Sequence, residues 1–256
     1  MRLLADIQAV LFDLGGTLAD YPVPAWPRLV LQCLRGVYGT LISPASKPLP
    51  PAAAMPDPDE AHARRRRPRP DTPAAHRVMI ALRRIVRGVS GHTLPSMAEF
   101  CTRPLVAEGR LFEDSLPTLR ALRERGYRLG LVSNTPWGTP EYLWEKQLEQ
   151  FGLDAWFDVS LFSSGIGFRK PDARIFQAAL EGLGIPAEAV LFVGNDPEAD
   201  VAGALRLGMR AALILRPGAA PAPASPPPDL CVRTLAELLV HLPPHPKSVD
   251  TSATPA

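Results

Sequence analysis

Apolar residues near the start of the chain form a short run, interrupted only by Gln8, and then give way to polar residues and glycine. Residues 7–12 read "IQAVLF" and are followed by "DLGGTL". A short apolar run that ends at a turn signal is typical of a strand buried on both faces of a parallel sheet. The pattern therefore predicts a central strand over residues 7–12, with Asp13 at its carboxyl end.

Helical and strand patterns alternate regularly from about residue 114 onward. The stretch "SLPTLRALRERGY" predicts an amphipathic helix with a serine cap and a glycine at its end. Further helices are predicted over "EYLWEKQLEQFGL", "DARIFQAALEGLG" and "EADVAGALRLG", and strands over "RLGLVSN", "FDVSLFSS", "AVLFVGN" and "AALILRPG". Strands that alternate with helices of this length form a parallel sheet covered on both faces. We therefore predict an α/β fold with a doubly wound parallel sheet.

Proline is unevenly distributed and suggests where the packed core is interrupted. Nine of the 30 prolines lie between Pro44 and Pro73, and six lie between Pro217 and Pro228. Such stretches are poor candidates for packed structure. We predict a core of residues 1–19 and 108–218, a helical cap of residues 20–107 with a disordered insertion at about 44–74, a proline-rich linker at 219–228, a C-terminal core element at 229–242 and a disordered tail at 243–256.

The charge balance favours a small anionic partner over a polyanion. The chain has 28 basic and 26 acidic residues, for a net charge of +2. The run Arg64–Arg67 can contact nucleic acid, but inside a proline-rich stretch a solvated linker is the simpler interpretation. We therefore expect no nucleic-acid partner, and composition leaves the oligomeric state open.

Cysteine and hydropathy patterns indicate a cytoplasmic protein. The three cysteines have no CxxC spacing, so neither a disulfide framework nor a zinc site is indicated. The N-terminal segment contains Asp6 and runs directly into the first strand, which argues against a cleaved signal peptide. No uncharged apolar stretch is long enough for a membrane span. We expect a cytoplasmic location and no membrane partner.

Each of four predicted strands is followed by polar residues that can take part in one reaction. They are Asp13 after the first strand, Ser133 and Asn134 in "LVSNTP", Lys170 in "GFRKPDARIF", and Asn195, Asp196 and Asp200 in "FVGNDPEADVAGA". The carboxyl ends of parallel strands meet at one edge of the sheet. A carboxylate can form a covalent intermediate that water later breaks, while a hydroxyl, a lysine and a bound hard cation hold an anionic group. Together these residues predict a hydrolase site for a small anion.

The ordered set "FDLGGTL", "LVSNT", "RKPDARIF" and "VGNDPEADVAGA" resembles the haloacid dehalogenase superfamily, over residues 7–20 and 111–217. Residues 18–110 resemble a helical cap inserted after the first motif. The resemblance implies a Rossmann-like core in which Asp13 is the nucleophile, Ser133 binds the transferred group and Lys170 steadies both. It further implies substrate binding by Gly16, Thr17 and Asn134. An implied Mg²⁺ site comprises Asp13, the backbone carbonyl of Gly15, Asn195, Asp196 and Asp200. The implied activity is a Mg²⁺-dependent phosphatase that acts on a small phosphorylated metabolite through an aspartyl-phosphate at Asp13.

Position 15 departs from the pattern that this resemblance implies. Phosphatases of the superfamily have a second aspartate two residues after the nucleophile, where this chain has Gly15. General acid–base help of that kind contributes about 10²–10⁴-fold to a rate. Its loss leaves two alternatives open. One is a metal-independent hydrolase similar to the 2-haloacid dehalogenases, and the other is a catalytically weak binding or regulatory protein.

The fourth motif also departs from the pattern. A Gly-Asp pair is usual there, but Asn195 follows Gly194. An amide in the ligand position would hold Mg²⁺ more weakly than a carboxylate. Reading one residue later, Asp196 and Asp200 restore an acidic pair at the expected spacing. We favour Asp196, and both assignments stay open at this point.

Overall fold

The computed structural model describes residues 4, 6–21, 102–103, 106–135, 139–217 and 225–245. The chain divides into two compact units, one of Met1–Asp20, Arg110–Asn134 and Leu148–Ala256, the other of Tyr21–Gly109 and Thr135–Gln147. Most of the predicted cap, including its predicted disordered insertion and the arginine run, lies outside the described residues, as does part of the predicted linker. The first unit carries the sheet.

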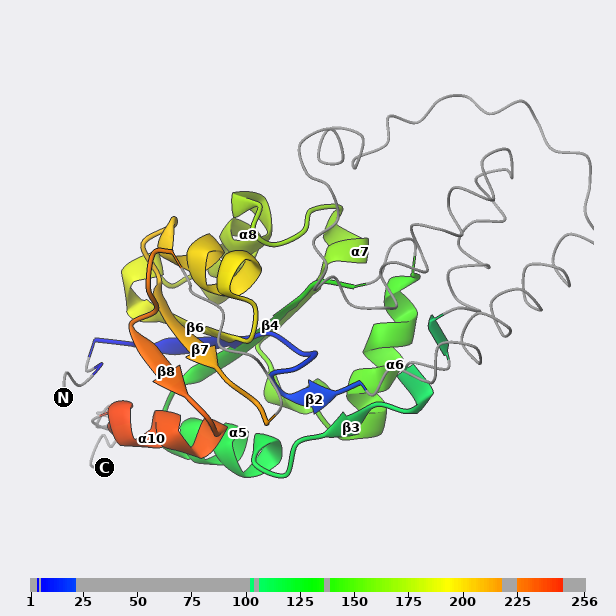
Figure 1. Ribbon diagram of the computed structural model, residues 1–256, viewed down its shortest axis with the longest axis horizontal. Helices are drawn as coiled ribbons and strands as arrows, with labels where there is room; N and C mark the ends of the chain where they lie inside the picture. Colours follow the sequence, from blue (N-terminus) through cyan, green and yellow to red (C-terminus); the bar gives the residue numbers. More distant parts are fainter. Residues whose placement is uncertain are drawn as a thin grey trace, which may run out of the picture. The chain divides into compact units, whose positions relative to one another are not determined.

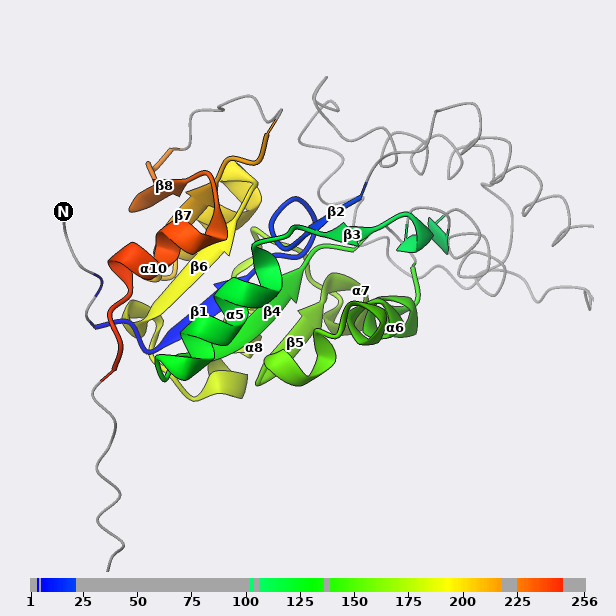
Figure 2. The same cartoon turned by 90° about the horizontal axis from the view of Figure 1, so that it is seen from below.

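Six parallel strands form the sheet, in the order β5-β4-β1-β6-β7-β8 (Figure 2). The strands are β1 (Ala9–Phe12), β4 (Arg128–Ser133), β5 (Val159–Phe162), β6 (Val190–Gly194), β7 (Arg210–Ile214) and β8 (Leu230–Val232). A separate antiparallel pair joins β2 (Ala19–Asp20) to β3 (Arg110–Leu111). The predicted α/β fold with a parallel sheet is confirmed.

Helical segments cover both faces of this sheet (Figures 1 and 2). On one face lie α8 (Ala173–Leu183), the π-helical turn η3 (Pro197–Ala202) and α9 (Gly203–Leu205), and on the other lie α5 (Ser115–Glu124), the 3₁₀ turn η4 (Leu235–Glu237) and α10 (Leu238–His241). The remaining elements are α6 (Glu141–Phe151), α7 (Ser163–Ile166) and the 3₁₀ turns η1 (Asp154–Trp156) and η2 (Ala187–Ala189).

The central strand β1 is buried on both faces, as its apolar run predicts. All four of its residues are fully buried. Leu11 belongs to the core cluster that contains Ile175 and Phe176 of α8. In the same cluster the rings of Phe176 and Phe192 pack edge to face at 5.2 Å. Burial of both faces fixes β1 in the middle of the sheet, and so fixes the position of Asp13 directly after it.

The predicted serine cap of α5 is wrong. Asp114 is the residue before the helix, and no side chain caps the helix there. Ser115 is instead fully buried, and its hydroxyl donates to the carbonyl of Leu18 at 2.7 Å. The hydroxyl satisfies a backbone group in the turn after β1, where no water can reach it. Gly126 follows the helix with φ 89°, which confirms the predicted glycine end.

The stretch predicted as one helix over "EADVAGALRLG" divides into two shorter elements. Residues Pro197–Ala202 form the π-helical turn, and the α-helix spans only Gly203–Leu205. In this turn both Asp200 and Val201 donate their backbone N–H to the Asp196 carbonyl, at 3.0 and 3.2 Å. The hydrogen bonds of this turn enclose more residues than those of an α-helix, so the apolar positions only partly follow a 3.6-residue spacing. Such π-helical turns are frequent at functional sites.

The C-terminal segment contacts the residues that follow α5. The Tyr127 hydroxyl donates to the Pro243 carbonyl at 2.6 Å, and the His245 N–H donates to the Arg125 carbonyl at 2.9 Å. The described chain thus continues three residues into the predicted tail of residues 243–256.

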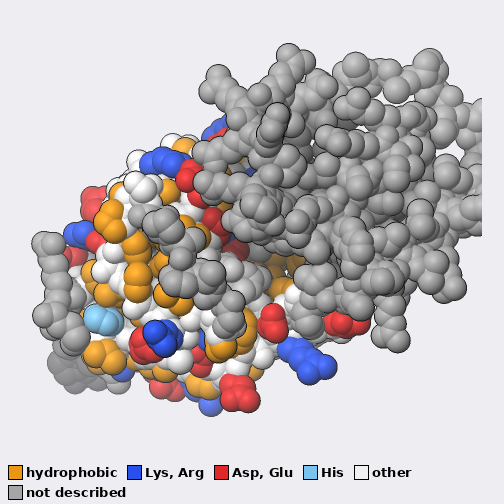
Figure 3. Space-filling view, in the orientation of Figure 1, with side chains coloured by type: hydrophobic (Ala, Val, Ile, Leu, Met, Phe, Trp, Pro, Cys, Tyr) orange, Lys and Arg blue, Asp and Glu red, His pale blue; other side chains and the backbone are white. Residues whose placement is uncertain are grey.

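The surface of the described residues mixes both signs of charge. On the face drawn in Figure 3, basic and acidic side chains are interspersed among apolar ones. Where the chain is described, none of its helices has both the length and the apolar character that crossing a membrane requires.

The second unit is described only in part. Within it, the rings of Tyr21 and Trp144 meet edge to face at 6.0 Å, and the hydroxyls of Thr102 and Thr139 lie 3.2 Å apart.

Candidate active site

Asp13 lies at the carboxyl edge of the sheet, between two neighbouring strands. Its backbone N–H donates to the Val193 carbonyl of β6 at 2.9 Å, which continues the parallel ladder one residue beyond β1. Its side chain is 9% exposed. Its Oδ2 accepts a long hydrogen bond of 3.4 Å from the Thr17 hydroxyl. The backbone therefore fixes the direction in which this carboxylate points.

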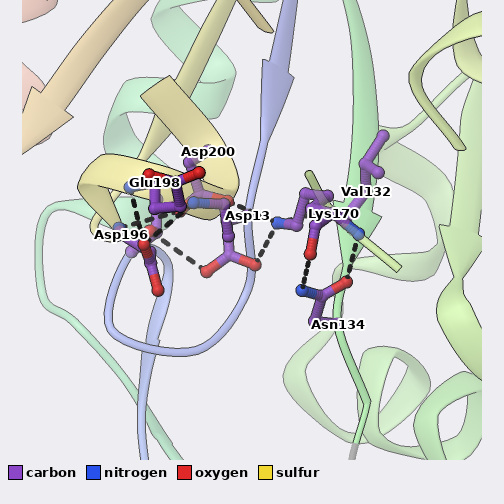
Figure 4. A network of polar contacts seen from close by, with 9 residues as sticks. Asp13, Val132, Asn134, Lys170, Asp196, Glu198 and Asp200 are labelled. Atoms are coloured by element: carbon purple, nitrogen blue, oxygen red, sulfur yellow. Dashed lines mark hydrogen bonds and ion pairs between the residues drawn. The ribbon is translucent and has the colours of Figure 1, made fainter. Parts of the chain in front are cut away.

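Lys170 connects Asp13 to Asp200 (Figure 4). Its Nζ lies 2.7 Å from Asp13 Oδ1 and 2.8 Å from Asp200 Oδ1, and it donates to the Val132 carbonyl at 2.7 Å. An ammonium has three protons, so these partners use all of its donors. The Lys170 side chain is only 1% exposed. We call Asp13, Lys170 and Asp200 the charged triad.

The triad contains one cation for two carboxylates, and this imbalance shifts its protonation equilibria. Burial alone would lower the pKa of Lys170, but Asp13 and Asp200 outweigh it and raise that pKa above its ordinary value. Burial raises the pKa of Asp200 to about 7, against the attraction of Lys170 and with the help of the Asp13 charge. Lys170 therefore stays charged at neutral pH, while Asp200 takes up a proton near pH 7.

Asp200 is held against the end of β6. Its Oδ2 accepts the backbone N–H of Asp196 at 2.9 Å. A Cβ at Gly194 would lie 2.2 Å from that same oxygen. A glycine is therefore required at position 194, because any side chain there would displace the carboxylate that Lys170 contacts.

The side chains of Asp196 and Asn195 have different partners. The Asp196 side chain accepts the N–H groups of Glu198 and Ala199 at 2.8 and 2.9 Å and so caps η3 (Figure 4). The amide of Asn195 lies over the turn after β1, where a Cβ on Gly16 would be 2.3 Å from Asn195 Nδ2. Gly16 also has φ 80°, a backbone conformation that favours glycine. The Asn195 amide thus lies beside the turn that follows Asp13, while the Asp196 carboxylate is engaged in capping η3.

Ser133 and Asn134 follow each other at the end of β4 but differ in surroundings. Ser133 is buried and pairs with Phe162 of β5. The Asn134 side chain accepts the N–H of Lys170 at 2.9 Å and donates to the Lys170 carbonyl at 3.0 Å. The oxygen and the nitrogen of the amide are therefore both bonded to the backbone of Lys170. The sequence predicts substrate binding by Asn134 and does not predict this contact.

Replacing Asn134 by alanine is expected to lower stability and turnover together. Two hydrogen bonds of about 0.5–1.5 kcal/mol each are lost, so the free energy of unfolding should fall by about 1–3 kcal/mol. With the role that the sequence predicts for Lys170, its displacement should lower kcat by about tenfold or more, because small misplacements of catalytic groups are costly. Urea unfolding and steady-state kinetics measure the two effects. Gln150→Ala, on the exposed side of α6, is the control, and a raised KM with unchanged kcat would instead indicate direct substrate binding.

Two groups that form hydrogen bonds in this region were not predicted from the sequence. One is the Val132 carbonyl, a backbone group that no residue type reveals. The other is Arg216, which donates to the Thr17 carbonyl at 2.5 Å. Arg216 directly follows an apolar strand in "LILRPG", so its position at a strand end resembles that of the other polar residues and could have identified it.

The donors around Asp13 suit a hard cation. Among the described residues, no three His, Cys, Asp or Glu side chains converge in a way that could hold a metal ion. By residue type, oxygens of mixed kind are available there: the Asp13 carboxylate, the backbone carbonyl of Gly15 and the amide of Asn195, whose nitrogen Nδ2 is the atom nearest Gly16. Mg²⁺ takes oxygen ligands, often with one or two carboxylates and several waters. This donor set therefore fits Mg²⁺, whereas both oxygens of Asp200 already have partners.

The fold and the triad together define an α/β protein with a buried aspartate–lysine–aspartate site at the carboxyl edge of a parallel sheet. The family model of haloacid dehalogenase-like hydrolases matches residues 7–208, and the chain belongs to this family. The sequence resemblance to this superfamily is thereby confirmed.

Two relatives of known name match about half of the chain. A glyceraldehyde 3-phosphate phosphatase of Methanothermobacter thermautotrophicus is 40% identical over 105 residues, which are 41% of this chain and 45% of the relative. A phosphoserine phosphatase of Thermus thermophilus is 36% identical over 130 residues, or 51% of this chain and 50% of the relative. The chain thus spans about half the length of the relatives that it matches.

Solved structures share the fold over most of the chain. A HAD phosphatase from Thermococcus onnurineus has a TM-score of 0.57 and 24% identity, and covers 91% of this chain and 96% of its own. A dehalogenase with an intermediate complex has a TM-score of 0.61 and 21% identity, and covers 94% of this chain and 99% of its own. At these identities the likeness concerns the fold alone, which phosphatases and dehalogenases have in common.

Proposed function

We propose that this protein is a Mg²⁺-dependent phosphatase that acts on a small phosphorylated metabolite through an aspartyl-phosphate at Asp13. The observation that carries the proposal is the contact of Lys170 Nζ with Asp13 and Asp200, at 2.7 and 2.8 Å. It places one cation where a phosphoryl group on Asp13 would add negative charge. The names of the relatives, two phosphatases of small phosphorylated molecules, support the same substrate class.

The two oxygens of Asp13 have different surroundings, which suggests the direction of attack. Oδ1 is bonded to Lys170, while Oδ2 accepts only the long Thr17 contact among the hydrogen bonds of the described residues. We assign Oδ2 as the nucleophile. It forms a bond to phosphorus as the bond to the leaving oxygen breaks, and that oxygen takes the electron pair. Water then attacks phosphorus, the bond between phosphorus and Oδ2 breaks, and the Asp13 carboxylate takes that electron pair. The protons of the water leave with the released phosphate.

Other residues of the site orient the group that is transferred. Ser133 lies at the end of the neighbouring strand, and we assign anion binding to its hydroxyl. Gly16 and Thr17 form the turn after Asp13, where their own N–H groups bond to the carbonyls of Ala19 and Leu14 at 2.7 and 3.3 Å. Asp13, the Gly15 carbonyl and Asn195 would hold Mg²⁺, in preference to Asp196, whose carboxylate caps η3. When bound, the ion would neutralise charge on the phosphoryl oxygens.

Gly15 limits which phosphates would react quickly. An alkyl ester releases a basic alkoxide, and without a nearby acid its reaction would lose about 10²–10⁴-fold, or about 3–5 kcal/mol in the barrier. An acyl phosphate or a phosphoanhydride releases a weakly basic group that needs no proton. We therefore place acyl phosphates and anhydrides ahead of alkyl esters. The small-anion partner and the cytoplasmic location expected from the sequence belong to this proposal.

The same glycine favours one alternative, a metal-independent hydrolase that displaces a halide from a 2-haloacid. Halide also leaves without a proton, so Gly15 is compatible with it. Phosphate release from acetyl phosphate and aryl phosphates, with Mg²⁺ and with a chelator, decides between the two. Turnover that the chelator abolishes supports the phosphatase. Chloride release from 2-chloropropionate that the chelator leaves unchanged supports the alternative, and inertness in both assays indicates a binding or regulatory protein.

A further inference from the structure

Arg216 joins three segments that are distant in the sequence. It follows β7, and its guanidinium bonds to Asp114 Oδ2 at 2.8 Å and to the Thr17 carbonyl at 2.5 Å. The guanidinium also stacks on the Phe112 ring, with Cζ 3.9 Å from the ring centroid. The Arg216 side chain is 11% exposed. An arginine that stacks and donates in two directions from one planar fork has little freedom left.

The partner of Arg216 is itself fixed. Asp114 Oδ2 also accepts the backbone N–H of Leu235 at 2.7 Å, which ties the start of α5 to η4. Next to it, the Ser115 hydroxyl bonds to the Leu18 carbonyl. The turn after β1 is thus fixed by side-chain hydrogen bonds to two successive backbone carbonyls, those of Thr17 and Leu18.

This turn carries the groups that face the nucleophile. The Thr17 hydroxyl donates to Asp13 Oδ2, and the N–H groups of Thr17 and Leu18 bond to the Leu14 carbonyl at 3.3 and 2.9 Å. A movement of the Thr17 carbonyl would shift its hydroxyl and amide relative to Asp13. Arg216 holds that carbonyl without reaching the reacting atoms in the described structure.

We propose that Arg216 is a positioning residue for the turn after Asp13, acting through the Thr17 carbonyl. Its effect on catalysis rests on the proposed function, but its effect on the turn does not. Lysine at this position would keep the charge and lose the planar fork and the stacking. The chain offers a matched control in Arg210, at the opposite end of β7, which pairs with Asp229 at 2.9 Å and is more exposed.

Two measurements test this role in the full chain carrying Arg216→Met, Arg216→Lys or Arg210→Met. Hydrogen exchange at the amides of residues 16–18 should be about tenfold faster in Arg216→Met, because these hydrogen bonds exchange by local opening. The rate at which acetyl phosphate labels Asp13 at saturation should fall by about tenfold or more, since misplacement is costly, while KM stays within about twofold. Arg216→Lys should lie between, and Arg210→Met should match the wild type in both.

The outcomes separate this proposal from the phosphatase assignment. Wild-type exchange in residues 16–18 of Arg216→Met would overturn the positioning role, whatever the activity. Faster exchange with an unchanged labelling rate would overturn its link to catalysis. If the wild type forms no adduct with acetyl phosphate, the phosphatase assignment fails, and exchange alone still decides the role of Arg216. If Arg216→Met does not fold, the comparison of Arg216→Lys with the wild type decides.

Discussion

Replacing Asp13 by asparagine is expected to abolish the covalent intermediate and to lower turnover of acetyl phosphate by about 10³-fold or more, the scale on which removal of a nucleophile acts. The asparagine amide cannot form a stable bond to phosphorus in place of the carboxylate. Mass spectrometry after mixing with acetyl phosphate should show a phosphate adduct on the wild-type protein and none on the variant. The adduct on the wild-type protein should persist. The aspartate that Gly15 replaces would also have activated the water that hydrolyses the adduct.

The same substitution should leave the fold intact. Asparagine can still accept a hydrogen bond from Lys170, and removal of the Asp13 charge takes away one cause of the raised Asp200 pKa. We expect a free energy of unfolding no lower than that of the wild type at pH 8. Asp20→Asn, at an exposed position in β2, is the control for both measurements. Full labelling of the Asp13→Asn variant would show that another residue is the nucleophile.

Replacing Lys170 by methionine is expected to have the largest effect on stability. Removal of one partner from a buried ion pair costs about 3–5 kcal/mol, and here it leaves two buried carboxylates, Asp13 and Asp200, without a cation. Methionine keeps most of the side-chain volume, so the loss reports charge more than packing. Lys146→Met removes an exposed lysine of α6 and should stay within about 0.5 kcal/mol of the wild type, as surface substitutions usually do.

The cost of Lys170→Met should depend on pH in a definite direction. The raised pKa of Lys170 means that its own stabilising contribution is complete below the unfolded pKa and is lost only as pH rises through the still higher folded pKa. Lys170 therefore stays charged across pH 5 to 8, so any pH dependence in this range comes from its carboxylate partners. The folded pKa of Asp200 is also raised, to about 7, so its contribution to stability falls as pH rises toward 7.

Without the lysine, Asp200 should take up a proton at still higher pH, and protonation relieves the repulsion from Asp13. The difference between Lys170→Met and the wild type should therefore be largest above pH 7 and should shrink toward pH 5. Urea unfolding at pH 5, 7 and 8.5 measures it. A difference that grows as pH falls would contradict the charge arrangement described for the triad.

The sequence predicts the sheet well because burial leaves a strong pattern. Residues 9–12 are apolar at every position, as expected for a central parallel strand, and all four are fully buried. Likewise, Asp13, Lys170 and Asp200 could be expected to converge because each follows a strand of one parallel sheet, whose carboxyl ends meet. The structure brings these three side chains into direct contact.

Other features depend on contacts that residue type does not specify. An asparagine after a strand looks the same whether it binds a ligand or, as Asn134 does, the backbone of a residue 36 positions later. A serine at a helix start is a usual cap, yet Ser115 reaches a carbonyl 97 positions earlier. The choice between Asn195 and Asp196 depends on which side chain caps the π-turn, and apolar periodicity does not distinguish that turn from an α-helix.

The triad has a consequence for the order of events during synthesis. Its members are residues 13, 170 and 200, and Arg216 contacts a carbonyl 199 positions earlier in the chain. When only the N-terminal half of the chain has been synthesised, Asp13 is present but its counter-ion Lys170 is not yet translated. The triad is therefore completed late, once Asp200 has been synthesised and β6 has docked beside β1.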